Sequence, residues 1–239
     1  MCWQQKQIDF KILTMKKTTF ILIFLCFSKL NFAQTKITTL DFPYNKDYVL
    51  ELAGVDTVFD IEGNVYKKNT PAALYTITEQ TKTKDKNLTT FMLRQVLGTD
   101  TITIKSKLLL NSKGMWVWFE DSAVQNEKKA LAISLPLVAG KKWETQSPEG
   151  KISCICKSMD TIISVPAGAF HCFEIDTKME GTKTESYEQY MIIKEFYNQQ
   201  IGKVAYHAYG YLYVYATKKT FTVYKEEEGL INYSGYKKN

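Results

Sequence analysis

The sequence is poor in the residues that acid–base chemistry and phosphate recognition usually need. It contains two histidines, His171 and His207, and Arg94 is the only arginine among its 31 basic residues. Histidine is the side chain that titrates near neutral pH, and arginine is the usual residue for bidentate contacts with phosphates and base edges. We therefore expect no nucleic-acid partner and little general acid–base catalysis.

The motifs of common enzyme classes are also missing. The chain has no G-x-S-x-G nucleophile elbow, no H-E-x-x-H zinc motif, no P-loop and no dinucleotide fingerprint. A hydrolase could use paired carboxylates, but nothing in the spacing of Glu174, Asp176, Glu185 and Glu188 ties them together. We predict that the protein is not an enzyme and needs no cofactor and no metal.

Long apolar runs are absent as well. The most apolar stretch, Phe20 to Phe27, spans eight residues, well short of the roughly 20 that a membrane-spanning helix needs. Lys16 and Lys17 precede it, and Asn31-Phe32-Ala33 follows it. A basic segment, a short apolar run and a small-residue site form a secretory signal peptide. We expect translation to start at Met15 and the protein to be exported to the periplasm or the exterior, without a transmembrane anchor.

This interpretation divides the chain into residues 1–33, an N-terminal extension with the signal peptide, and residues 34–239, a single β domain. Cleavage removes five lysines and one aspartate, and so lowers the net charge from +6 to +2. A chain of this length buries roughly 70% of its unfolded surface, which is enough for one substantial core.

Short β-rich runs separated by turn residues dominate residues 34–239. The clearest is Asp160 to Ile175, in which Val165-Pro166-Ala167-Gly168 should form the turn of a β-hairpin. Glu185 to Tyr197 is rich in aromatic and β-branched residues and is predicted to be a strand rather than a helix. Glu120 to Lys129 is either a short helix or an exposed connection, and Lys225 to Asn239 should fray. The pattern predicts an all-β fold, or a β-rich fold with one short helix, built as a strongly curved antiparallel sheet or half-open β-barrel.

The candidate ligand-binding residues are aromatic. Alternation places Tyr209, Tyr211, Tyr213 and Tyr215 on one face of a strand, where they could form an exposed stack or the wall of a groove. Trp143, most simply a core anchor, and Phe170 complete the predicted set of residues: Trp143, Phe170, Tyr209, Tyr211, Tyr213 and Tyr215.

Three cysteines remain after cleavage, Cys154, Cys156 and Cys172. Export permits a disulfide, and Cys154 or Cys156 could reach Cys172 if the two segments pack side by side. The alternative is three buried thiols that act as small hydrophobic residues. A metal site that also uses His171 is disfavoured, because neighbouring strand residues point to opposite faces. His171 is expected to share the face of Phe173 and Ile175.

Three groups of residues occur in a familiar order, Leu135-Pro136-Leu137 with Gly140-Lys141-Lys142-Trp143, then Val165 to Phe170, then Ile201-Gly202-Lys203-Val204. This order resembles an uncharacterised family of exported bacterial proteins with P-L-x-x-G-K-x-W and V-P-A-G-x-F signatures. By similarity, such domains are related to the LolA-like half-barrels that carry lipoproteins on a concave apolar face. The resemblance implies a fold and assigns no catalytic residues.

Export, the β pattern and the aromatic content together suggest a protein that binds a lipid or other hydrophobic ligand on a concave sheet face. The alternative is a structural module that docks a partner protein of the cell envelope through the same aromatic face. A hydrolase that acts on envelope material is the least favoured reading.

Overall fold

The computed structural model describes residues 35–83, 86–97, 100–119, 128–147 and 150–234. The predicted signal peptide and most of the predicted helix or connection at 120–129 lie outside these residues. The described part of residues 36–239 forms one compact unit. It contains the strands β1 (Val49–Phe59), β2 (Val65–Asn69), β3 (Ala72–Lys82), β4 (Lys86–Leu97), β5 (Asp100–Asn111), β6 (Gly114–Phe119), β7 (Lys128–Ser134), β8 (Lys142–Ser147), β9 (Gly150–Val165), β10 (Gly168–Lys183), β11 (Tyr187–Asn198), β12 (Gly202–Val214) and β13 (Lys219–Ser234).

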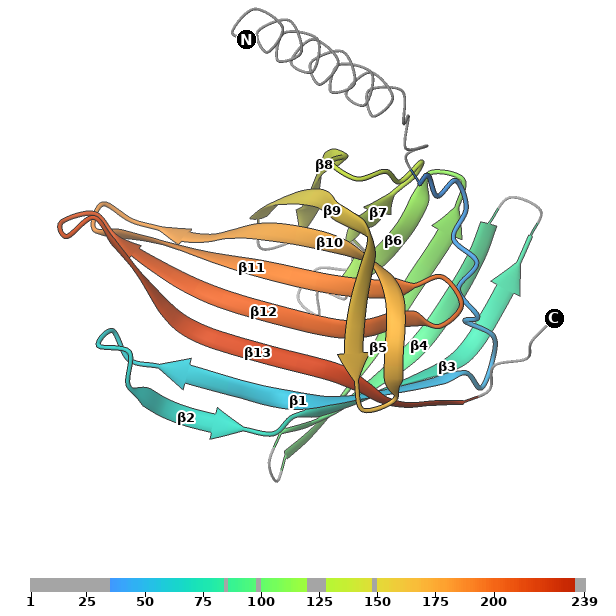
Figure 1. The fold of residues 1–239 in the computed structure, drawn as a ribbon, viewed down its shortest axis with the longest axis horizontal. Coiled ribbons are helices and arrows are strands. Elements are labelled where there is room, and N and C mark those ends of the chain that lie inside the picture. The colour runs from blue at the N-terminus through green and yellow to red at the C-terminus, as the bar shows by residue number, and fades with distance from the viewer. Residues whose placement is uncertain (1–34, 84–85, 98–99, 120–127, 148–149, 235–239) are drawn as a thin grey trace, which may run out of the picture. The chain divides into compact units, whose positions relative to one another are not determined.

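All of these strands belong to one antiparallel sheet. Its order is β7-β6-β5-β4-β3-β1-β13-β12-β11-β10-β9-β8, and β2 pairs with β1 beside this path. The sheet curls into a nearly closed, barrel-shaped body, from which the long strands β10 to β13 and the β1–β2 hairpin extend to one side (Figure 1). The described residues contain no helix. The prediction of an all-β, strongly curved antiparallel sheet is confirmed.

The two edge strands of the sheet, β7 and β8, meet along a seam. Trp143 Nε1 on β8 donates a hydrogen bond to the carbonyl oxygen of Leu131 on β7, at 2.9 Å. The amide of Leu131 in turn donates to Thr145 Oγ1, also at 2.9 Å. Side chains therefore satisfy backbone groups that a strand-to-strand ladder would otherwise pair, and they close the barrel.

The prediction that Lys225 to Asn239 frays is wrong for the described part of this segment. Residues up to Ser234 belong to β13, which lies between β1 and β12 at the centre of the sheet. Glu226, Glu228 and Leu230 alternate along one face and are buried. The polar composition was misleading because this strand places two carboxyl groups, rather than apolar side chains, inside the fold.

Long strands form the predicted hairpin around Val165-Pro166-Ala167-Gly168. The turn is confirmed, since β9 ends at Val165 and β10 begins at Gly168, but each of its strands is 16 residues long. The hairpin bends across the sheet so that its tip reaches β13 (Figure 1). There the Ala167 amide donates to the Leu230 carbonyl oxygen at 3.0 Å. Gly229 permits this approach, because a Cβ on it would lie 2.9 Å from Val165 Cγ1.

The face predicted for His171 is wrong. Its side chain is 72% exposed and lies 2.6 Å from Asp160, whereas Phe173 is buried. Two shifts of the β9–β10 register, between Cys172 and Ile175, interrupt the alternation at the bend of the hairpin. Both Cys172 and Phe173 consequently face apolar surroundings, which a regular strand could not allow.

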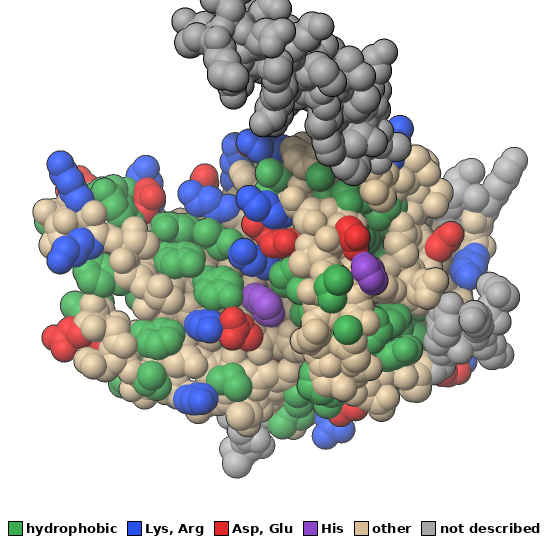
Figure 2. Space-filling model, in the orientation of Figure 1, with side chains coloured by type: hydrophobic (Ala, Val, Ile, Leu, Met, Phe, Trp, Pro, Cys, Tyr) green, Lys and Arg blue, Asp and Glu red, His purple; other side chains and the backbone are tan. Residues whose placement is uncertain are grey.

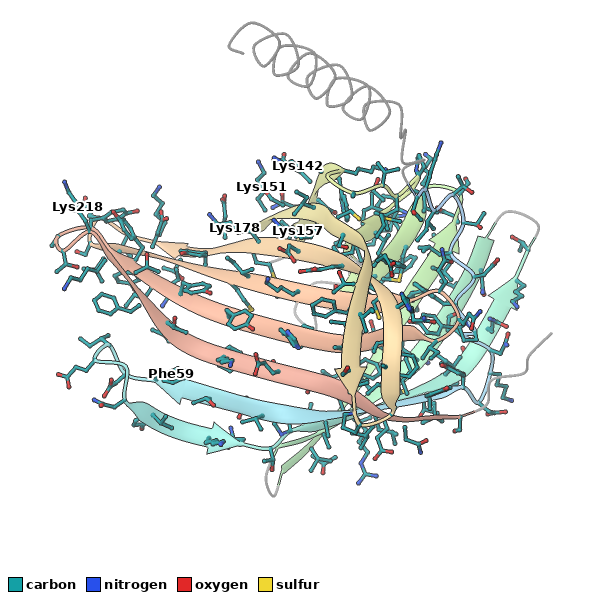
Figure 3. All side chains as sticks on the ribbon, viewed as in Figure 1. Phe59, Lys142, Lys151, Lys157, Lys178 and Lys218 are labelled. Carbon is teal, nitrogen blue, oxygen red and sulfur yellow. The ribbon has the colours of Figure 1, made fainter. Side chains whose placement is uncertain are left out.

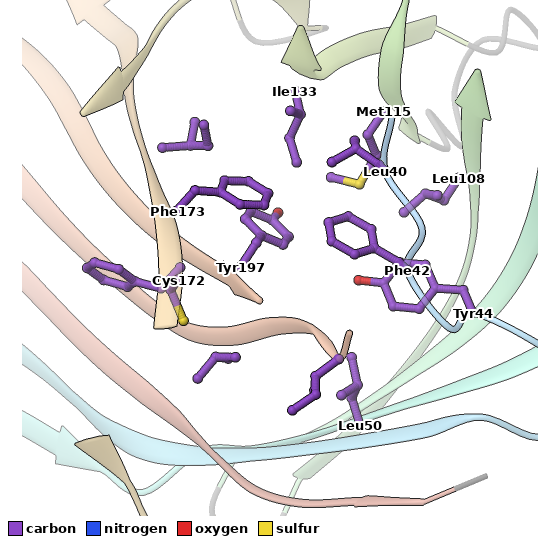
Figure 4. Packing of buried hydrophobic residues seen from close by; sticks show 14 of the residues in the cluster. Leu40, Phe42, Tyr44, Leu50, Leu108, Met115, Ile133, Cys172, Phe173 and Tyr197 are labelled. Carbon is purple, nitrogen blue, oxygen red and sulfur yellow. The ribbon is translucent and has the colours of Figure 1, made fainter. Parts of the chain in front are cut away.

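The core fills one end of the barrel. The chain from Ile37 to Tyr48 crosses this end without forming a strand, and Leu40, Phe42 and Tyr44 are buried there. The Phe42 ring stacks on Tyr197 and Phe173, with centroids 5.7 and 6.4 Å apart. Figure 4 shows these rings converging with side chains from several strands. This aromatic layer blocks one end of the barrel interior.

The outer surface mixes apolar and charged side chains. Green patches over β10 to β13 are separated by blue and red ones in Figure 2. Lys142, Lys151, Lys157 and Lys178 project from β8, β9 and β10, as Figure 3 shows. None of the described residues forms a helix that is long and apolar enough to cross a membrane.

Candidate functional site

The barrel contains a cavity of about 270 Å3 beside the aromatic layer, since Tyr44 and Tyr197 belong to both. Every strand of the sheet except β2 and β13 contributes to its wall. Most of the lining side chains are apolar, among them Leu108, Met115, Ile152 and Ile193. Concave, mainly apolar cavities with a few placed polar groups are the usual form of small-molecule sites.

Glu195 and Lys203 are the two charged side chains among the described residues that line the cavity. Lys203 Nζ lies 2.6 Å from Glu195 Oε1, and the two side chains are 20% and 17% exposed. The Lys203 ammonium also lies 5.4 to 6.0 Å from the ring centroids of Tyr75, Tyr197 and Tyr206. The cavity therefore has one polar region on an otherwise apolar wall.

A β-bulge brings this polar region together. Tyr197 pairs with Lys203 while Phe196 pairs with Ala205, so Val204 is an extra residue on β12. Without the bulge, Lys203 and Tyr206 would point to opposite faces, since they are three residues apart. With it, both lie on the face of Glu195 and Tyr197.

Electrostatics keep Lys203 charged and the hydroxyls protonated at neutral pH. Burial alone would lower the pKa of Lys203, but Glu195, Tyr197 and Tyr75 together outweigh it and hold this pKa well above its usual range. Burial raises the pKa of the surrounding tyrosines Tyr44, Tyr75, Tyr197 and Tyr206. Each of these hydroxyls thus remains a hydrogen-bond donor.

Thr89 adds a second polar feature to the cavity wall. Its side chain is buried, and its Oγ1 has no hydrogen-bond partner among the described residues. A buried hydroxyl without a partner is unfavourable by roughly 1 to 3 kcal/mol. A ligand with a hydrogen-bonding atom could satisfy it.

The predicted tyrosines share one face of the sheet, but it is the face opposite Tyr206. Tyr211 stacks across the strands on Tyr190, with centroids 5.1 Å apart, and Tyr213 meets Tyr215 edge to face. Tyr209 donates a hydrogen bond to Glu227. The four tyrosines are partly buried, only Tyr211 stacks across strands, and none of them belongs to the residues that line the cavity.

Trp143 and Phe170 do not line the cavity either. Trp143 shares the face of β8 with the lining residue Thr145 and packs against Ala130, Ile152 and Cys154 at the edge of the cavity. Phe170 lies near the hairpin tip, edge to face with Tyr233 at 6.4 Å. Ligand binding by the six aromatic residues stays a prediction.

The three thiols are free and buried in the structure. The β9–β10 register places Cys172 opposite Thr161, and Cys154 and Cys156 opposite Thr177 and Ile175. Cys172 therefore lies several residues along the ladder from either candidate partner, and the suggested disulfide is not formed. Burial raises the pKa of Cys154 and Cys156 to about 11, so these thiols are unreactive at neutral pH.

Sequence reasoning missed Glu195 and Lys203. One signal was available, because charged residues interrupt apolar and aromatic runs at Lys194-Glu195, between Ile193 and Phe196, and at Lys203, between Ile201 and Val204. Their proximity could not be predicted, since it depends on the bulge at Val204.

Comparison with known proteins matches no family model and no curated protein. Two solved structures are similar. One, from Bacteroides fragilis NCTC 9343, is described as an exported protein with a YmcC-like fold; it has 13% identity and a TM-score of 0.52, with 82% of this chain and 99% of that chain covered. The other, described as a lipoprotein of Parabacteroides distasonis ATCC 8503, has 12% identity, a TM-score of 0.48 and the same coverage. At 13% identity, the similarity to the first structure shows a shared fold and nothing beyond it. The chain has the architecture of the YmcC-like protein.

Proposed function

We propose that this chain is an exported, non-catalytic protein that holds a small apolar or amphiphilic molecule inside its barrel. The observation that carries the proposal is the cavity of about 270 Å3, which lies inside the curved sheet and is lined mainly by apolar side chains. The signal-peptide pattern before Gln34 and the exported protein of similar fold support export. The lipoprotein-carrier resemblance is compatible with the same use of the fold.

The cavity has room for a small molecule. At the roughly 30 Å3 that a water molecule occupies in the liquid, its volume of about 270 Å3 accommodates at least nine heavy atoms. That is enough for one medium-length alkyl chain or a small ring system.

Two measurements test the proposal. Native mass spectrometry of the protein purified from its producing cells, before and after organic extraction, should reveal a bound molecule of this size. Calorimetric titration of the extracted protein with 1-octanol should show one binding site. Octanol has about nine heavy atoms, which matches the available volume.

A variant that fills the cavity identifies the site. Ala132 lines the cavity, and Ala132→Phe should weaken octanol binding at least tenfold. Ala169→Phe is the matched control, because Ala169 is exposed near the tip of the β9–β10 hairpin. An Ala132→Phe protein that folds and binds octanol as tightly as the wild type would place the ligand elsewhere. A wild-type protein that neither retains a molecule nor binds octanol would contradict the function.

A further inference from the structure

The Glu195–Lys203 pair is only partly covered by protein. Both side chains line the cavity, and 17% and 20% of their surface remains exposed. Lys203 has three N–H donors, and Glu195 has two oxygens with about four acceptor sites. The contact between them at 2.6 Å uses one donor and one site, and Glu195 also forms a side-chain hydrogen bond with Tyr197. The pair can therefore both donate to and accept from a polar group on a ligand.

The polar region carries more negative than positive charge. Lys203 also interacts electrostatically with Glu226 and Glu228, which are buried further along the same interior face. Glu228 lies directly opposite Tyr206, which lines the cavity. A ligand carboxylate would compete with Glu195 for Lys203, and it would be repelled by Glu195 and by the ionised fraction of Glu226 and Glu228.

We infer that the polar region selects an uncharged amphiphile, a single medium-length chain that ends in a hydroxyl or amide group, and that it rejects fatty-acid carboxylates. This inference rests on the proposed function, because it assigns the chemistry of the ligand in the same cavity. A hydroxyl can accept from Lys203 and donate to Glu195 at once. A carboxylate offers only acceptors, and its burial without a free cation is costly.

Head-group selectivity can be measured on the full chain with probes of one length. Calorimetric titrations with 1-octanol and with octanoate, at about pH 7.5 where the acid is ionised, compare a hydroxyl with a carboxylate. We expect octanol to bind at least tenfold more tightly than octanoate. Octanoate binding as tight as octanol binding would overturn the inference and leave the proposed function intact. Failure of both probes would contradict the proposed function instead.

Removing the competing carboxylate should change the selectivity. In Glu195→Gln, the Lys203 ammonium loses its counter-ion, so octanoate should bind at least tenfold more tightly than to the wild type, while octanol affinity changes less than threefold. Glu174→Gln is the matched control, because Glu174 pairs with Lys194 at 3.8 Å and does not line the cavity. Unchanged octanoate binding by a folded Glu195→Gln protein would contradict the role of the pair.

A double variant covers the case in which Glu195→Gln does not fold. Glu195→Gln with Lys203→Gln removes both charges and keeps hydrogen-bonding groups at both positions. It should bind octanol within threefold of the wild type and bind octanoate no more tightly than the wild type does. Tighter octanoate binding by this variant would show that Lys203 is not the group that would attract an anion.

Discussion

Lys203 and Glu228 are ionisable side chains inside the fold, and they differ in how their charge is compensated. Charged groups are rarely buried unless they are paired, and Lys203 obeys this rule through Glu195. Glu228 does not, because its Oε1 has no hydrogen-bond partner among the described residues. Burial and the neighbouring Glu226 raise the pKa of Glu228 to about 7. This carboxyl group is therefore half protonated near neutral pH.

The stability of the protein should consequently depend on pH through Glu228. In the unfolded chain this group titrates near its ordinary value of 4.5, against a pKa of about 7 in the folded protein. Between these values the folded state holds a proton that the unfolded state has released. The stabilising contribution is therefore complete below about pH 4.5 and is lost as the pH rises through about 7. Glu228→Gln removes this dependence.

Urea unfolding at several pH values measures the effect. Between about pH 4.5 and pH 8, we expect the wild type to lose about 3 kcal/mol more stability than Glu228→Gln. Glu227→Gln is the control, since burial of Glu227 is outweighed by hydrogen bonds from Lys225 and Tyr209, which lower its pKa. Parallel curves for the wild type and Glu228→Gln would show that Glu228 titrates normally in the folded state.

At the scale of elements, strands and turns could be predicted from the sequence, whereas bulges could not. The turn of the β9–β10 hairpin and the strand β11 follow from local composition, because Pro166 and Gly168 favour a reversal and Tyr190 to Tyr197 favours extended backbone. Bulges depend on the partner strand. The bulge beside Phe173 turns His171 to the outer surface. The bulge at Val204 turns Lys203 to the face of Glu195, and so determines which residues form the candidate site.

Docking of the β9–β10 hairpin on β13 should depend on the missing side chain of Gly229. In Gly229→Ala, the new Cβ would lie 2.9 Å from Val165 Cγ1, and such overpacking typically costs about 1 to 3 kcal/mol. Adding Val165→Ala removes the closest contact and leaves Val165 Cβ at 3.3 Å. The double variant should therefore be more stable than the sum of the single effects predicts, by about 1 kcal/mol, in a denaturant double-mutant cycle.

Ile163→Ala provides the comparison for this cycle. Ile163 belongs to the same strand and packs on the core, but it is not among the nearest neighbours of a Cβ at Gly229. Its effect should add to that of Gly229→Ala. Equal coupling energies between Gly229→Ala and either Val165→Ala or Ile163→Ala would mean that the tip of the β9–β10 hairpin does not contact Gly229.

For the whole molecule, residues of the P-L-x-x-G-K-x-W segment and of Ile201 to Val204 help to close the barrel. Lys141 Nζ donates hydrogen bonds to the carbonyl oxygens of Ser134 and Pro136, at 3.0 and 2.8 Å, and Leu137 pairs with Ile37. Gly202 has a φ of +95°, and a Cβ there would overlap the Tyr44 hydroxyl. The sequence thus predicts a curved sheet through its turns. The position of the cavity requires the strand order and the chain crossing the barrel end, which no local pattern encodes.

The seam between β7 and β8 provides the last prediction, because the closed interior requires that these two edges meet. Trp143→Phe keeps the aromatic packing but removes the hydrogen bond to the Leu131 carbonyl, and should cost about 1 kcal/mol. Combined with Thr145→Val, which removes the acceptor for the Leu131 amide, it leaves both backbone groups of Leu131 unpaired at the seam.

Amide hydrogen exchange should then increase in β7 and β8 while β11 and β12, which are paired on both sides, keep their protection. Trp116→Phe is the matched control, since Trp116 Nε1 is buried without a hydrogen-bond partner among the described residues. Removing that N–H deletes no hydrogen bond, so amide exchange in β7 and β8 of this variant should match that of the wild type.

Because Leu131 and Thr145 also line the cavity, the opened seam should accelerate ligand dissociation. Faster exchange in β7 and β8 with unchanged octanol dissociation would separate barrel closure from retention of the ligand.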